Sequence, residues 1–335
     1  MTYSEFAQKQ SLPYEAKVAH ATIRAREFAD KVSFLGKDCH VSVGGLDSIT
    51  LYLFLKSIHI HVPAVSVSSL EDKSIQAVHQ SLGIESILPY KSKVEVIRDL
   101  GYPVISKEKA GKISLLQNPT EKNATVRHAI VTGECGKQGG YRTVETGSRM
   151  RLPQKWLDLF GGMVNAEYGT NYKEAPFKVS DKCCYYMKEK PCDDWAKRNN
   201  SVPYLGLMAS EGGQREKSLI AHGCNYYGKT TIRSCPFAIF TRQDLLQLAL
   251  DLQVPVPSIY GTIERKEDGT LYTTKAQRTG CTMCGFGIHI EKRPHRFDRL
   301  RETNPAEWRF WMYTQGWGNV LTYIGIDWED VYKAD

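Results

Sequence analysis

The sequence predicts an α/β fold built around a parallel sheet. Short β-prone segments alternate with segments of helical periodicity between about residues 40 and 100. The glycine pair Gly44-Gly45 separates the first of these strands from the helix that follows it. Such alternation favours parallel strands that are joined by right-handed helical crossovers.

The individual elements follow from periodicity and from the residues that start or stop them. Apolar residues recur at helical spacing over residues 14–34, and Gly36 can end that helix. The helix expected last begins with Thr241-Arg242-Gln243-Asp244, which is close to a capping box. Strands are expected at residues 40–43, 63–68, 86–89 and 202–208. Further helices are expected at residues 48–58, 72–82, 94–100, 154–160 and 241–252.

Two stretches depart from this alternation. Residues 111–146 are rich in Gly, Thr, Asn and Lys and lack clear periodicity, which predicts a long loop or insertion. The tail, residues 305–335, contains four tryptophans and predicts a helical cap on the core. We therefore expect three parts. They are an N-terminal helical segment at 1–36, a ligand-binding domain at 37–260 with an insertion at about 111–150, and a Cys-x-x-Cys region with a helical C-terminal cap at 261–335.

Composition restricts the class of protein and of ligand. Hydrophobic residues make up 41% and charged residues 24% of the 335 residues, as is usual for a globular chain. No apolar run approaches the roughly 20 residues that span a bilayer, and the first 13 residues are polar, so we expect no membrane segment and a cytoplasmic location. The net charge of +7 favours anionic ligands, either nucleotide or nucleic acid.

The segment Gly44-Gly45-Leu46-Asp47-Ser48 has the composition of an anion-binding turn. A sharp turn from a strand into a helix points backbone N–H groups at a bound phosphate, and glycine lets that phosphate approach the backbone. Open α/β sheets bind ligands at such junctions. The segment is not a Walker A loop, because Gly-x-x-x-x-Gly-Lys-Ser/Thr is absent from the sequence. On this motif alone, an ordinary turn between strand and helix is the alternative.

The cysteines suggest a metal centre. Cys281-Thr282-Met283-Cys284 is a Cys-x-x-Cys framed by glycines, and an adjacent pair, Cys183-Cys184, precedes it. Four thiolates suit a [4Fe-4S] cluster or a structural zinc, and iron is favoured because adjacent cysteines seldom both bind one tetrahedral zinc. Zinc or reduced thiols without metal are the alternatives. The five other cysteines lack comparable spacing and are expected to be buried thiols.

Together these motifs resemble a known family. The glycine segment resembles the Ser-Gly-Gly-x-Asp-Ser loop of PP-loop ATP pyrophosphatases and phosphoadenosine phosphosulfate (PAPS) reductases, with Val43 in place of the first serine. The cysteine order is similar to the cluster motif of adenylyl sulfate reductases. Four more blocks resemble the family in order and spacing, at residues 102–108, 175–182, 206–215 and 236–244. The likeness, which runs from about Val41 to Glu291, is closest to the PAPS reductase-like proteins of the PP-loop adenine nucleotide alpha-hydrolase superfamily.

The resemblance implies a Rossmann-like parallel sheet with a PP-loop, and it assigns roles to individual residues. Arginine and lysine are included because they bind phosphate or sulfate. The implied nucleotide-binding residues are Gly44, Gly45, Leu46, Asp47, Ser48, Val67, Ser68, Lys182 and Arg278. The implied catalytic residues are Asp47, Ser48, Lys107 and Arg215. The implied cluster ligands are Cys183, Cys184, Cys281 and Cys284.

The chain departs from the reductases at its C-terminus. A sulfonucleotide reductase attacks the sulfate sulfur with a cysteine of a Glu-Cys-Gly-Leu/Ile-His motif near its end. This chain has no cysteine after Cys284, and Glu134-Cys135-Gly136 is the alternative position for such a nucleophile. PAPS or adenylyl sulfate reduction to sulfite is therefore the second hypothesis.

The first hypothesis is the other chemistry of the superfamily. ATP is cleaved at its α-phosphate to AMP and pyrophosphate, Mg²⁺ bridges the phosphates, and the activated substrate receives sulfur. By analogy with cluster-bearing proteins of DNA phosphorothioation, the sulfur donor is expected to be a cysteine desulfurase and the acceptor to include nucleic acid. A nucleotide-binding module with a cluster and no turnover, which Val43 favours, is the third hypothesis.

Overall fold

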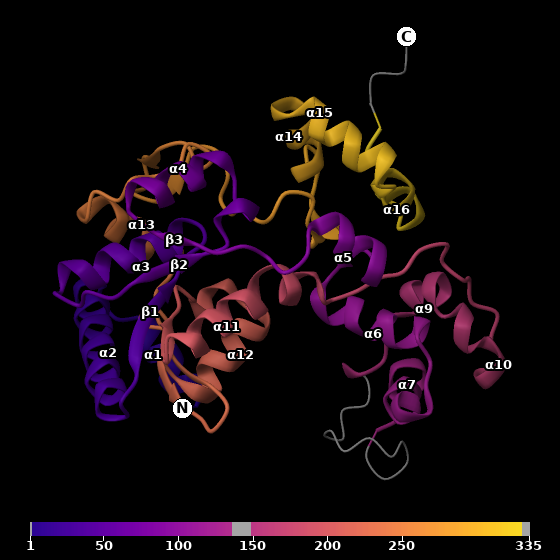
Figure 1. Ribbon diagram of the computed structural model, residues 1–335, viewed down its shortest axis with the longest axis horizontal. Coiled ribbons are helices and arrows are strands. Elements are labelled where there is room, and N and C mark those ends of the chain that lie inside the picture. Colours follow the sequence, from indigo (N-terminus) through magenta and orange to yellow (C-terminus); the bar gives the residue numbers. More distant parts are fainter. Residues whose placement is uncertain (1, 136–148, 330–335) are drawn as a thin grey trace. The chain divides into compact units, whose positions relative to one another are not determined.

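The computed structural model describes residues 2–135 and 149–329 of the chain, which forms two compact units (Figure 1). The first unit comprises Met1–Tyr90 and Lys188–Thr282, and the second comprises Lys91–Met187 and Met283–Asp335. These units differ from the expected domains. Residues 91–187, which were expected in the 37–260 domain, form the second unit together with residues 283–335. Each unit is described by itself.

The first unit contains a six-stranded sheet in the order β3-β2-β1-β5-β7-β6. Neighbouring strands are parallel except for the antiparallel pair β6 and β7. The chain thus has an α/β fold with a mostly parallel central sheet, which confirms the predicted class and is compatible with a Rossmann-like fold. The strands are β1 Asp38–Ser42, β2 Ala64–Ser66, β3 Glu85–Ser86, β5 Ser201–Tyr204, β6 Asn225–Tyr227 and β7 Ile232–Ser234.

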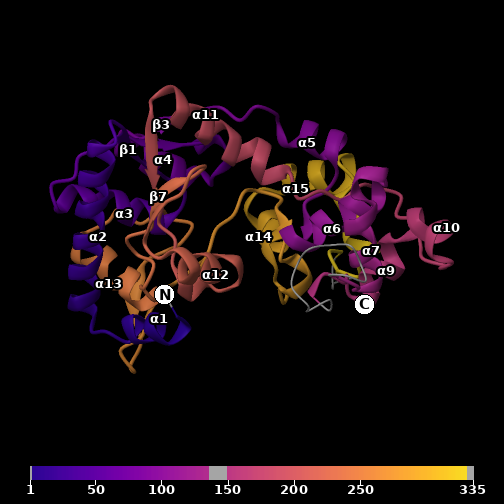
Figure 2. The ribbon, with the colours of Figure 1, turned by 90° about the horizontal axis from the view of Figure 1, so that it is seen from below.

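Helices cover this sheet. Figure 2 shows α2, α3 and α13 grouped on one side of the strands and α11 on the other. The ammonium of Lys17 on α2 lies 2.8 Å from the Asp244 carboxylate on α13, and both side chains are buried. The helices of this unit are α1 Tyr3–Gln10, α2 Tyr14–Phe34, α3 Leu46–Ser57, α4 Lys73–Ser81, α11 Lys190–Arg198, α12 Gly213–His222 and α13 Arg242–Asp251. A hairpin of β8 Ile263–Arg265 and β9 Leu271–Thr273 completes the unit.

Strand β1 lies at the point in the sheet where the order of strand addition reverses. It pairs with β2 on one side and with β5 on the other, so the chain builds the sheet outward from β1 first one way and then the other. In open α/β sheets the crevice outside the carboxyl ends of the strands at such a point is where ligands bind. The glycine segment 44–48 follows the carboxyl end of β1 and therefore lies at this point.

A buried histidine on β1 should make the stability of the first unit depend on pH. The ring of His40 bonds to the Ser201 hydroxyl at 2.8 Å and packs against Trp195, and burial lowers its pKa to about 4. An unfolded histidine has a pKa near 6.5. The free energy of unfolding that the neutral His40 ring contributes is therefore complete above that pH and is lost as the pH falls toward 4. Urea unfolding should show a loss of about 1.4 kcal/mol per pH unit from this residue. His40→Gln should remove that part of the slope and the exposed control His61→Gln should not; equal slopes in the two variants would contradict the assignment.

The second unit is mainly helical and has its own hydrophobic core. Its two short strands, β4 Val104–Ile105 and β10 Gly285–Phe286, pair in parallel. Gly285 has no room for a side chain, because an added Cβ would lie 2.7 Å from the fully buried ring of Trp317. The α-helices are α5 Lys93–Leu100, α6 Lys107–Gln117, α7 Ala124–Thr132, α9 Gln154–Phe160, α10 Asn165–Tyr168, α14 Arg296–Thr303, α15 Pro305–Arg309 and α16 Trp317–Tyr323. A π-helical turn, Phe310–Thr314, joins α15 to α16.

One expectation about this unit was wrong. The predicted loop after residue 111 is helical as far as Thr132, because α6 and α7 bury small apolar stripes that include Ile113 and Ile130. Residues 136–148 of the predicted insertion lie outside the described residues. The tail is helical, as expected, and its tryptophans, including Trp308 and Trp328, pack into the core of the second unit. Among the described residues, every helix is too short or too polar to cross a lipid bilayer.

Candidate nucleotide-binding site

The glycine loop, which we define as Gly44–Ser48, joins β1 to α3. Val43 is buried, and its N–H donates to the Val65 carbonyl oxygen of the neighbouring strand at 2.8 Å. Gly45 is then the N-cap of α3, which begins at Leu46. The first N–H groups of a helix have no acceptor within the helix, and the helix dipole makes this end positive. The loop therefore has the geometry of an anion site.

Side chains of the loop and of α4 fix this turn. The Ser48 hydroxyl accepts a hydrogen bond from the Gly44 N–H at 2.7 Å and donates to the Gly45 carbonyl oxygen at 2.9 Å. His79 Nε2 lies 2.8 Å from the Gly44 carbonyl oxygen, and its Nδ1 lies 2.8 Å from the Ser68 hydroxyl. Because burial lowers the pKa of His79, the ring is neutral, with Nε2 donating and Nδ1 accepting.

Four of the predicted nucleotide-binding residues belong to this network or lie next to it in the sequence. Ser48 supports the turn directly, and Ser68 supports it through His79. Val67 is buried beside Ser68, and Leu46 presents its N–H at the first position of α3 while its side chain is buried. Contact of Ser68 and Val67 with a nucleotide stays a prediction.

The space beside the Gly45 Cα is filled by a tyrosine from a distant part of the sequence. A Cβ added to Gly45 would lie 2.3 Å from the Tyr260 hydroxyl and 3.2 Å from the Thr279 hydroxyl. The Tyr260 hydroxyl accepts a hydrogen bond from the Leu46 N–H at 3.2 Å. Glycine is therefore required at position 45 by close approach.

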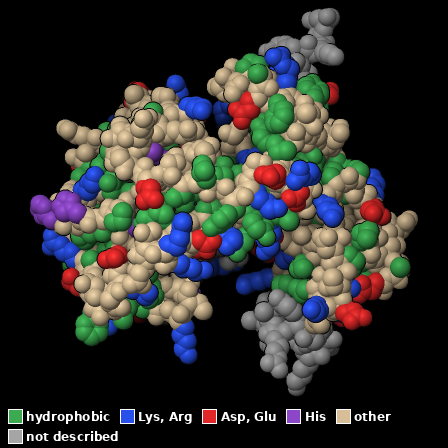
Figure 3. All heavy atoms as spheres, in the orientation of Figure 1, with side chains coloured by type: hydrophobic (Ala, Val, Ile, Leu, Met, Phe, Trp, Pro, Cys, Tyr) green, Lys and Arg blue, Asp and Glu red, His purple; other side chains and the backbone are tan. Residues whose placement is uncertain are grey.

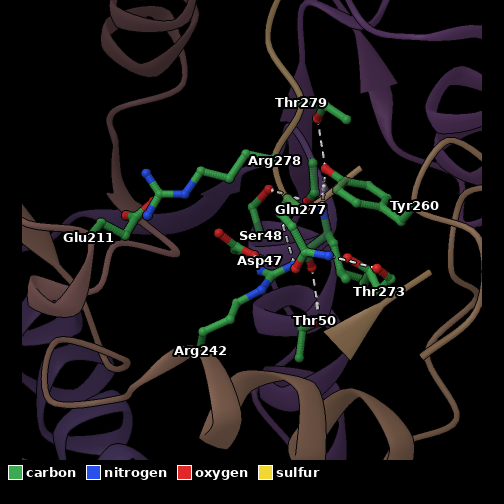
Figure 4. Close-up of polar contacts among 12 residues, drawn as sticks. Asp47, Ser48, Thr50, Glu211, Arg242, Tyr260, Thr273, Gln277, Arg278 and Thr279 are labelled. Atoms are coloured by element: carbon green, nitrogen blue, oxygen red, sulfur yellow. Dashed lines mark hydrogen bonds and ion pairs between the residues drawn. The ribbon is translucent and has the colours of Figure 1, made fainter. Parts of the chain in front are cut away.

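Asp47 forms an ion pair at the edge of the loop. Its carboxylate lies 2.6 Å from the guanidinium of Arg242, the first residue of α13, and Figure 4 shows the two side chains pointing toward each other. Burial raises the pKa of Asp47, and Arg242 opposes this shift. Behind Asp47, a Cβ added to Gly206 would lie 3.0 Å from the Asp47 carbonyl oxygen, so the chain after β5 passes close to the start of α3.

A second carboxylate gathers two more arginines. Glu211 pairs with Arg215 and, at 3.4 Å, with Arg278, and its side chain is 5% exposed. Both arginine side chains are more than half exposed. Arg278 precedes Thr279, whose hydroxyl would lie 3.2 Å from a Cβ on Gly45, so Arg278 and its partner Glu211 lie near the loop. The first unit thus brings two predicted residues, Arg215 and Arg278, to the glycine loop together with Arg242. Guanidinium groups form two parallel hydrogen bonds to phosphate, so this set suits a polyphosphate.

Four of these residues were missed by sequence reasoning: Arg242, Glu211, Tyr260 and His79. Glu211 stands four residues before Arg215, and this spacing of opposite charges could have indicated the pair, although Gly212 and Gly213 separate Glu211 from the body of α12. The capping box at Thr241 marked the start of α13 but not the direction of Arg242. No local pattern marks Tyr260 or His79, because each meets the loop through tertiary contacts.

Two predicted residues belong to the second unit. Lys107 is the first residue of α6, and the ammonium of Lys182 lies 3.7 Å from the carboxylate of Asp181. Contact of either lysine with a nucleotide stays a prediction.

The four predicted cluster cysteines are divided by the unit boundary. Cys281 belongs to the first unit, and Cys183, Cys184 and Cys284 belong to the second. Cys183 is buried and the other three are partly buried. Within residues 2–135 and 149–329, no three Cys, His, Asp or Glu side chains gather in an arrangement that could hold a metal ion. Four thiols are the donor set that iron–sulfur clusters use, so the chemistry of these residues fits the cluster. Their assignment as ligands stays a prediction.

Cys281 lies close to the glycine loop through the partly buried Lys188. The Lys188 ammonium lies 2.5 Å from the Glu71 carboxylate, which is itself 3.5 Å from the position of a Cβ on Gly44. Burial opposes the charge on Lys188, but the nearby Cys281 and Glu71 together raise its pKa.

Most of the remaining cysteines behave as buried thiols. Burial raises the pKa of Cys39 and Cys235 to about 12 and that of Cys192 and Cys224 to about 11, so these thiols stay protonated. Cys135 is partly buried and precedes the residues that the structure does not describe.

Comparison of the chain with family models, with curated proteins and with solved structures finds no match. Membership of the PAPS reductase-like family is therefore a proposal.

Proposed function

We propose that this chain is a PP-loop enzyme of the PAPS reductase-like family that binds ATP on the glycine loop and cleaves it at the α-phosphate. One observation carries the proposal: a glycine turn at the switch point of a parallel sheet leads into the N-terminus of α3 and is flanked by Arg242, Arg215 and Arg278. Backbone N–H groups and guanidinium groups together match the oxygens of a polyphosphate.

The residues of the first unit suggest how the reaction proceeds. An oxygen of the substrate attacks the α-phosphorus, the bond from that phosphorus to the bridging oxygen breaks, and pyrophosphate leaves. The loop N–H groups and the arginines stabilise the charge that develops on the departing pyrophosphate. A sulfur or nitrogen nucleophile then displaces AMP from the adenylated substrate. Asp47, Glu71 and Glu211 are carboxylates near the loop, and such groups fit the way Mg²⁺ is held by one or two carboxylates together with substrate phosphates.

The remaining parts of the proposal rest on the cysteine motifs and on charge. Cys183, Cys184, Cys281 and Cys284 would hold a [4Fe-4S] cluster, which supplies one-electron chemistry when bound. A cysteine desulfurase would supply sulfur in the cytoplasm, and nucleic acid is included among the acceptors. On the face drawn in Figure 3, basic side chains are interspersed with acidic ones, a distribution that suits a nucleotide better than a long nucleic-acid track.

A nucleotide-binding module without turnover is the second candidate. Val43 is buried and contributes only its backbone to the neighbouring strand, whereas the family has a serine there. The loop therefore lacks one hydroxyl that could contact a phosphate.

The decisive experiment identifies the products. Incubation with ATP and Mg²⁺, in which water takes the place of the substrate oxygen, should yield AMP and pyrophosphate in equal amounts, and Asp47→Asn should lower the rate about 100-fold because a charge beside the phosphates is lost. Asp251→Asn, a surface variant on α13, is the matched control and should keep the full rate. Sulfite release from PAPS with a sulfonate adduct on Cys135 would instead establish the reductase. Nucleotide binding without any product would establish the module.

A further inference from the structure

Tyr260 occupies the place on the glycine loop that a phosphate oxygen needs. Its hydroxyl accepts the N–H of Leu46 at the first position of α3, and it fills the space above Gly45. Tyr260 is 3% exposed, and burial raises its pKa, so the hydroxyl stays protonated. A phosphate that binds this helix N-terminus must use the same N–H and the same space. Tyr260 and a bound phosphate are therefore alternatives.

The same hydroxyl holds a segment that leads to Cys281. We define the strap as Gln277–Thr279, the three residues that end two positions before that cysteine. Tyr260 bonds to the Thr279 hydroxyl at 2.7 Å, and Arg242 donates to the Gln277 carbonyl oxygen at 3.1 Å. Arg278 pairs with Glu211 on the other side of the loop, as Figure 4 shows. Each residue of the strap is thus held by a polar contact to the loop or to a residue beside it, and the Gln277 side chain also donates to the Thr273 carbonyl oxygen at 2.6 Å.

In each of these three contacts, a bound phosphate would compete for one of the groups involved. Tyr260 competes with it for the Leu46 N–H, and Arg242 and Arg278 are guanidiniums that would exchange carboxylate or carbonyl partners for phosphate oxygens. One ligand would therefore release the three contacts that hold the strap to the loop and to the charged residues beside it. Differential contacts of this kind are what allow a ligand to shift a conformational equilibrium.

We propose that Tyr260 and the strap form a latch over the glycine loop, and that the phosphates of a bound nucleotide open it by displacing the Tyr260 hydroxyl. Opening frees the segment that leads into Cys281, so occupancy of the nucleotide site controls the mobility of the Cys-x-x-Cys region. This inference rests on the proposed nucleotide site but not on turnover.

Hydrogen exchange of the full chain tests the latch without any catalysis. Tyr260→Phe keeps the ring and removes both hydrogen bonds, so the peptide covering residues 277–282 should exchange about three- to tenfold faster than in the wild type. Pyrophosphate, used as a probe that loads the loop without adenine, should produce the same increase in the wild type. The control Tyr272→Phe, which removes a hydroxyl from the β8–β9 hairpin, should leave this peptide unchanged. Unchanged exchange in Tyr260→Phe or with pyrophosphate would overturn the latch.

Calorimetry separates the latch from a second role for Tyr260. If phosphate displaces the hydroxyl, Tyr260→Phe should bind ATP about three- to tenfold more tightly, because the closed state has lost its hydrogen bonds. Weaker binding would make Tyr260 a phosphate ligand and would overturn the latch. ATP binding with the expected exchange but without AMP formation would refute the proposed turnover and leave the latch standing. Failure of both ATP and pyrophosphate to bind would refute the nucleotide site and, with it, the opening by phosphate.

Discussion

Replacing Gly45 with valine is expected to weaken ATP binding about 100-fold and to lower the free energy of unfolding by about 1–3 kcal/mol. A Cβ at this position would lie 2.3 Å from the Tyr260 hydroxyl, and the branched methyl groups would fill the space where phosphate meets the backbone. Calorimetric titration with ATP measures the affinity, and urea unfolding measures the stability.

The neighbouring glycine provides the matched control for this variant. A Cβ on Gly44 would lie 3.5 Å from the Glu71 carboxylate, which is an ordinary contact. Gly44→Ala should therefore keep its stability and most of its affinity, whereas Gly45→Ala should lose part of both. Unchanged ATP affinity in Gly45→Val would place the nucleotide elsewhere.

Substituting Cys281 with serine is expected to remove most of the iron from the protein. Protein purified without oxygen should be brown and contain about four iron and four sulfide per chain if the four predicted thiolates hold a [4Fe-4S] cluster. Loss of one thiolate ligand should release the cluster and destabilise the surrounding packing. Metal analysis and the visible absorption spectrum measure the first effect, and thermal unfolding measures the second.

Cys192→Ser is the control because burial raises the pKa of this thiol to about 11, which keeps it protonated and unsuited to bind metal. It should keep its iron and its stability. Equal iron loss from both variants would show that the ligands are assigned wrongly. Zinc in place of iron would reject the cluster.

Long periodic segments were predictable from the sequence because their own apolar spacing specifies them. The helices expected at residues 14–34 and 154–160 are observed as Tyr14–Phe34 and Gln154–Phe160, and the capping box at Thr241 is present. Short strands carry little local signal. The pair Asn225–Tyr227 and Ile232–Ser234 was not predicted, because its stability comes from pairing with each other and with β5.

The helices at residues 107–132 were missed for a related reason. Most positions of α6 are polar or small, and its buried face is limited to Ala110, Ile113 and Leu116. Packing against the other residues of the second core, rather than intrinsic propensity, makes this segment helical.

For the candidate site, the sequence by itself determined the glycine loop and the strand and helix around it, because a turn of this kind is specified within a few residues. The tertiary structure decided which charges surround it. Arg242, Glu211 and Tyr260 lie about 160 to 215 residues from the loop and reach it through the packing of α13 and of the chain after β5. Long-range contacts of this kind leave no periodic or spacing signal. Residues that are distant in the sequence come into contact only when the sheet and its helices are assembled.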